Sequence, residues 1–261
     1  MSVPRLEARA VHFSYMSAAP VIRGASLFLN HGGMGALIGP NGCGKSTLIR
    51  LMAGLLAPSQ GEVRLNGEPL SSLTSGARTQ LLAYVPQSTA RAFPFTALEV
   101  VLTGRMPHLP RFAFESRRDV EKAREALEAT GIAYLAERRI TELSGGERQL
   151  VSVARALAQE PSCLLLDEPA ASLDLKHRAA LVRTLANLRE SRGLTILMVT
   201  HDLSLIQPEF SIVFAMHRGV IAASGSPSET LQESVLAEIY EDQNVRVRHT
   251  DGRTFVWSEA S

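Results

Sequence analysis

The stretch Gly39-Pro-Asn-Gly-Cys-Gly-Lys-Ser-Thr47 has the residue types of a phosphate-binding loop. Its glycines let successive backbone N–H groups turn inward around an anion, and a following helix adds partial positive charge. Lys45 is placed to reach the β- and γ-phosphates of a nucleotide, and the Ser46 hydroxyl to ligate Mg²⁺. The alternative is a glycine-rich turn without function. The flanks favour the phosphate loop, because an apolar run at Met34–Ile38 precedes it and a helical segment at 48–53 follows.

Two carboxylates directly follow a second apolar run. Asp167 and Glu168 come after three leucines at 164–166, and the carboxyl ends of parallel strands are where open sheets bind ligands. Asp167 would hold Mg²⁺ through its water shell, and Glu168 would polarise an attacking water molecule. The alternative is an acidic residue that caps a helix after a buried strand. The phosphate loop elsewhere in the chain favours the metal site.

A second candidate anion site is the segment Leu143-Ser-Gly-Gly-Glu147 at the start of a helix predicted over 150–158. The Ser144 hydroxyl and the backbone N–H groups of Gly145 and Gly146 suit a phosphate. Simple capping of the helix by Ser144 and Glu147 is the alternative, and both can be true together. Because a nucleotide has one phosphate tail, a second phosphate site predicts a second chain that brings its nucleotide across an interface.

Hydrophobic patterns predict the elements that must position these residues. Alternation over Leu6–Phe13 and 21–29 predicts an antiparallel β layer that leads into the phosphate loop. Apolar runs at Cys163–Asp167 and Thr195–Val199 flank a helix predicted over 177–192, and this order implies parallel pairing through a right-handed crossover. Two further short strands are expected, at 62–65 and Leu82–Val85.

From residue 88 to residue 158, helical periodicity replaces the strand patterns. The clearest helix is 117–130, where Val120, Ala123, Ala126 and Leu127 fall on one face. We therefore expect a helical subdomain at 88–158, inserted between two halves of an α/β core. The last residues, 226–261, are expected to form an extension with a β-hairpin around Asp251-Gly252.

Composition excludes several classes of protein. The 261 residues carry 27 Lys and Arg against 26 Asp and Glu, so no strongly basic surface for nucleic acid or a membrane is expected. Cys43 and Cys163 are the two cysteines, and we expect them to be unpaired in a reducing compartment. No signal peptide and no apolar run of the roughly 18–20 residues that span a bilayer are visible. A membrane role would therefore require a partner.

Taken together and in order, these motifs resemble the nucleotide-binding subunit of ATP-binding cassette (ABC) transporters, over roughly residues 6–225. The matching segments are the phosphate loop at 39–47, the glutamine loop at Gln87, the signature at 143–147, the acidic strand end at 164–168, the loop at 172–174 and the switch residue His201. The resemblance implies a single ABC ATPase domain over 1–261. Its implied fold is α/β, a P-loop NTPase-like mixed sheet with the antiparallel layer and the inserted helical subdomain.

The resemblance also implies roles for individual residues, with ATP and Mg²⁺ as cofactors. Tyr15 would stack on adenine, Gln87 would contact Mg²⁺ and the attacking water, His201 would contact the γ-phosphate and orient Glu168, and Asp174 would cross to the opposite subunit. The alternative for Tyr15 is an ordinary core residue at the end of a strand. Without its neighbours, His201 would be interpreted as a residue that caps a helix at the end of a strand. The sequence departs from the usual family pattern at two places, Ala170-Ala171 and Glu147, and both departures leave the implied mechanism intact. The implied catalytic residues are Glu168, His201 and Gln87; the metal site comprises Ser46, Gln87 and Asp167; and the nucleotide contacts are Tyr15, Gly39, Pro40, Asn41, Gly42, Cys43, Gly44, Lys45, Ser46, Thr47, Ser144, Gly145, Gly146 and Asp174.

The segment after the glutamine loop resembles one subfamily, the importers of ferric siderophores, haem and vitamin B12. The matching residues are Glu99-Val-Val-Leu-Thr-Gly-Arg105 and Pro107-His108. That resemblance implies a homodimer of ATPase subunits on the cytoplasmic face of the inner membrane, with permease subunits and, indirectly, a substrate-binding protein as partners, and no nucleic acid. Alternatives are another importer, an exporter or a non-transport ABC ATPase. Phe93-Pro-Phe95 would be an exposed apolar patch for the permease, or would pack inside the helical subdomain.

Overall fold

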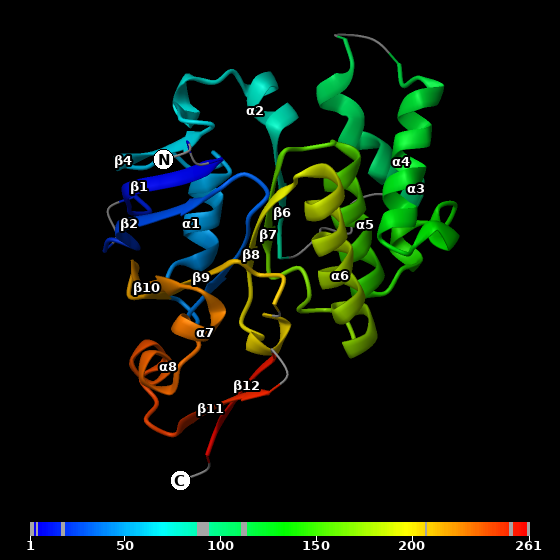
Figure 1. Cartoon of the computed structure of the whole chain (residues 1–261). Coiled ribbons are helices and arrows are strands. Elements are labelled where there is room, and N and C mark those ends of the chain that lie inside the picture. Colours follow the sequence, from blue (N-terminus) through cyan, green and yellow to red (C-terminus); the bar gives the residue numbers. More distant parts are fainter. Residues whose placement is uncertain are drawn as a thin grey trace.

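The computed structural model describes residues 3, 5–16, 19–87, 94–110, 114–206, 208–250 and 253–259. Within them a mixed sheet lies at the centre, an antiparallel sheet covers one side and a group of helices covers the other (Figure 1). No helix in these ranges is long and apolar enough to cross a membrane.

The central sheet has the strand order β10-β9-β3-β8-β7-β6. Its strands pair in parallel except that β10 is antiparallel to β9. Strands β3, β7 and β8 are buried along their whole length, as expected for parallel strands covered on both faces. The bounds are β3 (Met34–Ile38), β6 (Leu82–Val85), β7 (Cys163–Asp167), β8 (Thr195–Val199), β9 (Ile212–His217) and β10 (Val220–Gly225).

The carboxyl ends of four parallel strands lie at one edge of this sheet. The phosphate loop follows β3, Gln87 follows β6, Glu168 follows β7 and His201 follows β8. Residues that are far apart in the chain therefore come together at the edge where open α/β sheets bind ligands.

The antiparallel sheet has the order β2-β1-β4-β5. Helix α1 (Lys45–Met52) lies between the two sheets, and its buried Leu48, Ile49, Leu51 and Met52 share one hydrophobic core with both. The predicted antiparallel layer is thus present, and its core fixes the helix that follows the phosphate loop. The bounds are β1 (Leu6–Phe13), β2 (Ile22–Leu29), β4 (Gln60–Leu65) and β5 (Glu68–Pro69).

Helical elements occupy the chain between β6 and β7, at the right of Figure 1. On α4, Ala123, Ala126 and Leu127 are buried, as the periodicity predicts, whereas Val120 is only partly buried. The subdomain boundary at 88 stays a prediction, because residues 88–93 lie outside the described ranges. The bounds are α3 (Ala97–Leu102), η2 (Thr103–His108), α4 (Arg117–Ala129), η3 (Ala133–Leu135), η4 (Ile140–Glu142) and α5 (Gly145–Ala158).

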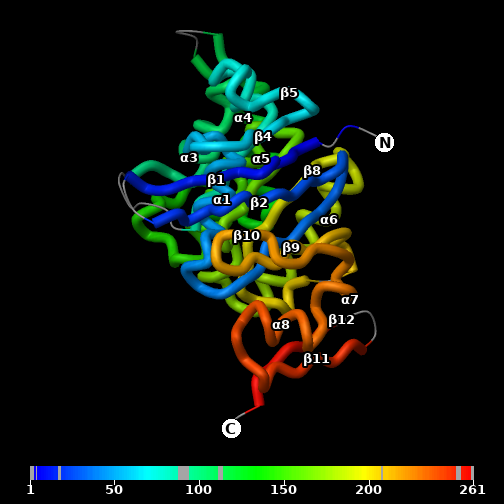
Figure 2. Tube along the Cα trace, turned by 90° about the vertical axis from the view of Figure 1, so that its left-hand side faces the viewer, coloured from blue at the N-terminus to red at the C-terminus, as the bar shows by residue number. Residues whose placement is uncertain are grey.

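The remaining elements complete the core and the C-terminal end. The hairpin of β11 and β12 lies beyond α8, at the end of the molecule opposite α4 (Figure 2). The extension predicted at 226–261 therefore contains a hairpin, preceded by two helices that the sequence patterns did not indicate. The bounds are η1 (Leu70–Ser72), α2 (Ser75–Leu81), α6 (Leu175–Arg192), η5 (Leu203–Leu205), α7 (Pro227–Thr230), α8 (Glu233–Tyr240), β11 (Val245–Thr250) and β12 (Arg253–Ser258).

Three helices begin earlier than predicted. Helix α1 begins at Lys45 rather than residue 48, α5 at Gly145 rather than 150, and α6 at Leu175 rather than 177. The reason is local. For α5 and α6, Ser144 and Asp174 accept hydrogen bonds from backbone N–H groups in the first turn, so these two helices start directly after their caps. Helix α1 starts directly after Gly44, which has no side-chain cap.

Candidate functional site

The phosphate loop takes a backbone shape that requires glycine. Gly39, Gly42 and Gly44 have φ values of 144°, 79° and 110°, which L side chains rarely adopt. A Cβ on Gly39 would also lie 2.1 Å from the carbonyl oxygen of Met216. Gly44 is the N-cap of α1 and supplies no side-chain cap, so the first N–H groups of that helix are available to an anion.

Lys45 is buried inside this loop, with 5% of its surface exposed. Its Nζ donates to the carbonyl oxygens of Gly39 and Pro40, at 2.7 and 2.9 Å. The ammonium group thus lies against the loop that would surround a phosphate, held by neutral acceptors that a phosphate oxygen can replace.

Ser46 and Asp167 are 121 residues apart in the chain but are bonded to each other. The Ser46 hydroxyl donates to Asp167 Oδ1 at 3.0 Å, and the Tyr84 hydroxyl donates to Oδ2 at 3.2 Å. Burial raises the pKa of Asp167, and these two hydrogen bonds partly offset that rise. A hydroxyl beside a carboxylate is a set of hard oxygen ligands, so these residues fit Mg²⁺.

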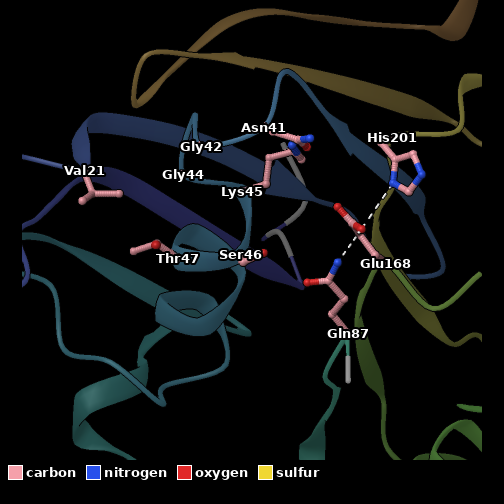
Figure 3. A pocket seen from close by; sticks show the side chains of 10 residues that line it. All are labelled: Val21, Asn41, Gly42, Gly44, Lys45, Ser46, Thr47, Gln87, Glu168 and His201. Carbon is pink, nitrogen blue, oxygen red and sulfur yellow. Dashed lines mark hydrogen bonds and ion pairs between the residues drawn. The ribbon is translucent and has the colours of Figure 1, made fainter. Parts of the chain in front are cut away.

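Glu168 is the centre of a second polar cluster beside the loop. Gln87 Nε2 donates to Glu168 Oε2 at 2.7 Å, and His201 Nδ1 lies 3.2 Å from the same oxygen. All three side chains line one cavity of about 520 Å³ with Lys45 and Ser46 (Figure 3). Glu168 has a φ of 48°, a strained backbone of the kind that proteins tolerate at functional sites.

Tyr15 lies beside the lining residue Thr47, at the rim of the cavity, rather than in the core. The residue is 41% exposed, and its ring meets Phe13 edge to face, with the ring centroids 4.8 Å apart. Its hydroxyl is 3.3 Å from Thr47 Oγ1. The alternative of an ordinary core tyrosine does not fit this exposure.

The second candidate anion site forms a separate cavity of about 310 Å³, lined by Ser144, Gly145, Gly146 and Asp174 among others. Among the residues that the structure describes, it shares no lining residue with the cavity around Lys45. Ser144 also caps α5: its Oγ accepts from the Glu147 N–H at 3.2 Å, and Glu147 Oε2 accepts from the Ser144 N–H at 2.7 Å. The Ser144 N–H lowers the pKa of Glu147. Capping and a glycine-lined cavity therefore coexist.

Comparison with known proteins decides the family. The model of the ABC transporter family matches residues 22–171. The ferric enterobactin transport ATP-binding protein FepC of Escherichia coli is 36% identical over 92% of this chain and 88% of its own length. The hemin import ATP-binding protein HmuV of Streptomyces coelicolor is 40% identical over 89% of this chain and 82% of its own. A solved ABC transporter of metal-chelate type, in an inward-facing conformation, superposes with a TM-score of 0.82 and 28% identity, covering 97% of this chain and 96% of that one.

The chain belongs to the ABC transporter family. It is an ATP-binding subunit of an importer of this family, an ATPase coupled to transport. The mixed sheet with its antiparallel layer is the ABC cassette fold, as the solved relative shows.

The segment from Phe95 to His108, which contains the residues that resemble the subfamily, has an exposed part and a buried part. Phe95 is 52% exposed, whereas Arg105 is 5% exposed; Phe93 lies outside the described residues. Arg105 bonds Asp119 at 3.1 Å, Glu160 at 2.8 Å and the Ala158 carbonyl oxygen at 2.6 Å. The arginine therefore ties the segment to α4 and to the end of α5 and does not face a partner.

Sequence reasoning missed Tyr84 and Arg50, which extend the network behind Asp167. Interaction with the Tyr84 hydroxyl, and to a smaller extent with the Tyr15 hydroxyl, raises the pKa of Arg50 on α1. The available signal was weak. Tyr84 lies in the strand that leads to Gln87, and the hydroxyl of a partly buried tyrosine usually forms a hydrogen bond.

Proposed function

We propose that this ATPase powers uptake of a metal chelate, a ferric siderophore or haem, or of cobalamin. The main supporting observation is the cluster in which Gln87 and His201 hold the Glu168 carboxylate beside Lys45 in one cavity. This cluster supports hydrolysis of a nucleoside triphosphate in that cavity. The printed functions of FepC and HmuV and the segment from Glu99 to His108 support the cargo class.

In this proposal Glu168 acts as the general base. Its carboxylate accepts a proton from the attacking water while His201, on the same oxygen, keeps the carboxylate oriented and reaches the γ-phosphate. Gln87 donates to the same oxygen and would help place the water. Lys45 would leave its two carbonyl partners and bind the β- and γ-phosphates.

Ser46, Asp167 and Gln87 are the residues that would hold Mg²⁺, which supplies charge neutralisation at the phosphates when it is bound. Tyr15, at the rim, is suited to stack on adenine. The nucleotide contacts proposed for the loop are those of residues 39–47. These assignments use side chains that line one cavity or lie directly behind it.

Two copies are proposed to face each other head to tail. Each ATP would lie between the phosphate loop of one copy and Ser144, Gly145 and Gly146 of the other, with Asp174 crossing between them. The separation of the two cavities within one chain supports this arrangement. ATP binding would close the pair and hydrolysis would open it, because closure alone lets both halves contact the same nucleotide.

The proposed partners are permease subunits at the cytoplasmic face of the inner membrane and, through them, a substrate-binding protein. The exposed Phe95 at the start of the helical segment supports a docking place for a permease there.

The proposed domain organisation is one ABC domain over 1–261, with a helical subdomain at 88–158 and an extension at 226–261. No nucleic-acid partner is proposed, since the net charge is +1.

The test is reconstitution of the ATPase with its permease in lipid vesicles. Substrate-binding proteins loaded with a ferric siderophore, haem or cobalamin are added in turn, and ATP hydrolysis and cargo uptake are measured. Stimulation and uptake by one of the three are expected. Stimulation by none of the three, with export of a compound from loaded vesicles, would contradict the import proposal.

Phe95→Asp tests the docking place in the same preparation. The isolated subunit should keep its affinity for ATP, because the phosphate loop lies elsewhere, whereas assembly with the permease should fail. Normal assembly and transport by this variant would contradict docking at Phe95, and an unfolded variant would place Phe95 in the core of the helical segment.

A further inference from the structure

Tyr84 lies beside the Asp167 carboxylate, and no step proposed above uses it. Strands β6 and β7 pair in parallel, with Tyr84 opposite Leu165. The Tyr84 hydroxyl is 3.2 Å from Asp167 Oδ2, while Ser46 bonds Oδ1 at 3.0 Å. The two oxygens of this carboxylate are thus held from two different elements, β6 and α1.

The chemistry of the groups sets the direction of these hydrogen bonds. An ionised carboxylate can only accept a hydrogen bond. The hydroxyls of Tyr84 and Ser46 therefore both donate their protons to Asp167.

Asp167 depends on this bond because it is fully buried, with none of its surface exposed. Within the part of the chain that the structure describes, Ser46 and Tyr84 are the side chains bonded to its carboxylate. Without the tyrosine hydroxyl, Oδ2 would be a buried acceptor without that partner, and the carboxylate would be free to turn away from Ser46.

We propose that Tyr84 is a positioning residue of the divalent-cation site: it holds Asp167 Oδ2 so that Oδ1 stays bonded to the hydroxyl of Ser46, a residue that lines the phosphate cavity. This inference rests on the proposed role of Ser46 and Asp167 as metal-holding residues.

The test is a titration of the full-length chain with Mn²⁺ in the presence of ADP, followed by electron paramagnetic resonance of free Mn²⁺. ADP is used because it occupies the phosphate loop without hydrolysis or closure around a γ-phosphate. Tyr84→Phe keeps the ring and removes the hydroxyl. We expect it to raise the Kd of Mn²⁺ about tenfold, the lower end of what loss of an outer-shell partner costs. The affinity for ADP with excess chelator should stay within about twofold, because the phosphate-loop contacts are unchanged.

Two control variants bracket this result. Asp167→Asn should lose Mn²⁺ affinity at least as strongly as Tyr84→Phe. Ser191→Ala, which removes an exposed hydroxyl near the end of α6, should leave Mn²⁺ affinity at the wild-type value.

The outcomes separate this inference from the proposed function. If Tyr84→Phe binds Mn²⁺ as tightly as the wild type while Asp167→Asn binds it more weakly, the role of Tyr84 is overturned and the proposed metal site is not. A fall in metal-free ADP affinity and in Tm together would show that Tyr84 is merely structural, and would also overturn it. A wild-type chain that binds neither ADP nor Mn²⁺ would overturn the nucleotide site and the inference with it.

Discussion

Two cations, Lys45 and Arg105, are equally buried in this ATPase, each with 5% of its surface exposed, but their partners differ. Lys45 donates to two backbone carbonyl oxygens and, among the residues that the structure describes, has no carboxylate within ion-pair distance. Arg105 has two carboxylates, Asp119 and Glu160, and a carbonyl oxygen. This difference is expected if Lys45 keeps its charge for a ligand and Arg105 uses its charge to hold the fold.

The physical reason is the cost of burying a charge without a counter-ion. Neutral acceptors only partly offset the desolvation cost of a buried ammonium group, and a bound phosphate would supply the missing negative charge. A guanidinium that already has two carboxylates gains nothing from a ligand, and breaking its cluster leaves charges unpaired. The comparison therefore predicts that changes near Lys45 affect the reaction and changes near Arg105 affect stability.

The largest effect is expected for Glu168→Gln in the nucleotide cavity. The amide cannot accept the proton of the attacking water but keeps the shape of the side chain, so kcat for ATP hydrolysis should fall about 10²–10⁴-fold. ATP binding should persist and a closed dimer should accumulate, visible by gel filtration with MgATP. Glu128→Gln, on an exposed face of α4, is the matched control; hydrolysis at the normal rate by Glu168→Gln would refute the role.

Arg105→Met should have the next largest effect, and on stability rather than on nucleotide binding. It leaves Asp119 buried without its arginine, and breaking a buried ion pair costs about 3–5 kcal/mol of unfolding free energy. Chemical denaturation measures the loss, with Arg118→Met, at an exposed position of α4 next to Asp119, as control. If Arg105→Met is as stable as the wild type but binds ADP more weakly, Arg105 serves nucleotide binding rather than stability, and the comparison is wrong.

Lys45→Met should have the opposite profile. Loss of its charged hydrogen bonds to phosphate should weaken ATP binding by about 30–100-fold, measured by fluorescence of a labelled nucleotide. The unfolding free energy should fall little, since the methionine removes a buried charge that has no ionic partner. A loss of stability as large as that of Arg105→Met would show that Lys45 is structural as well.

Acid should lower the stability that Asp119, the buried partner of Arg105, contributes to the fold. Hydrogen bonds from Ser116, and then the bond and charge of Arg105, lower the pKa of Asp119 to about 2 from its usual value of 3.8. Because the lowered pKa belongs to the folded state, Asp119 contributes stability above about pH 4, and that contribution is lost as the pH falls toward 2. Asp119→Asn should flatten this part of the stability curve; an unchanged slope would argue against the assignment.

The smallest effect concerns the two thiols. Burial raises the pKa of Cys43, and raises that of Cys163 to about 12. Both should react slowly with an alkylating reagent at neutral pH, and Cys43, in the phosphate loop, should react more slowly still with MgATP bound. Mass spectrometry of labelled peptides measures both, with the fully buried Cys163 as the internal control; a Cys43 rate that is equal with and without MgATP would place the nucleotide elsewhere.

Most of the fold could be predicted because its signals are local. The apolar runs of β3, β7 and β8 are short and unbroken, and the strand–helix–strand order permits one handedness. Strands β9 and β10 were missed, although β9 is mostly buried and lies beside β3. The prediction of an ABC importer ATPase is confirmed by the relatives, whereas the residue-level roles stay predictions.

The sequence by itself determined the phosphate loop, its flanking strand and helix, the capped start of α5 and the family. Each depends on residues a few positions apart, where glycine conformations and capping side chains act. Only the tertiary structure decided that Gln87, Glu168 and His201 meet at one oxygen, that Tyr84 and Ser46 share Asp167, and that Arg105 turns inward. These contacts join separate strands and helices, so they arise from how β6, β7, β8 and α1 pack around a common core, which no local spacing encodes.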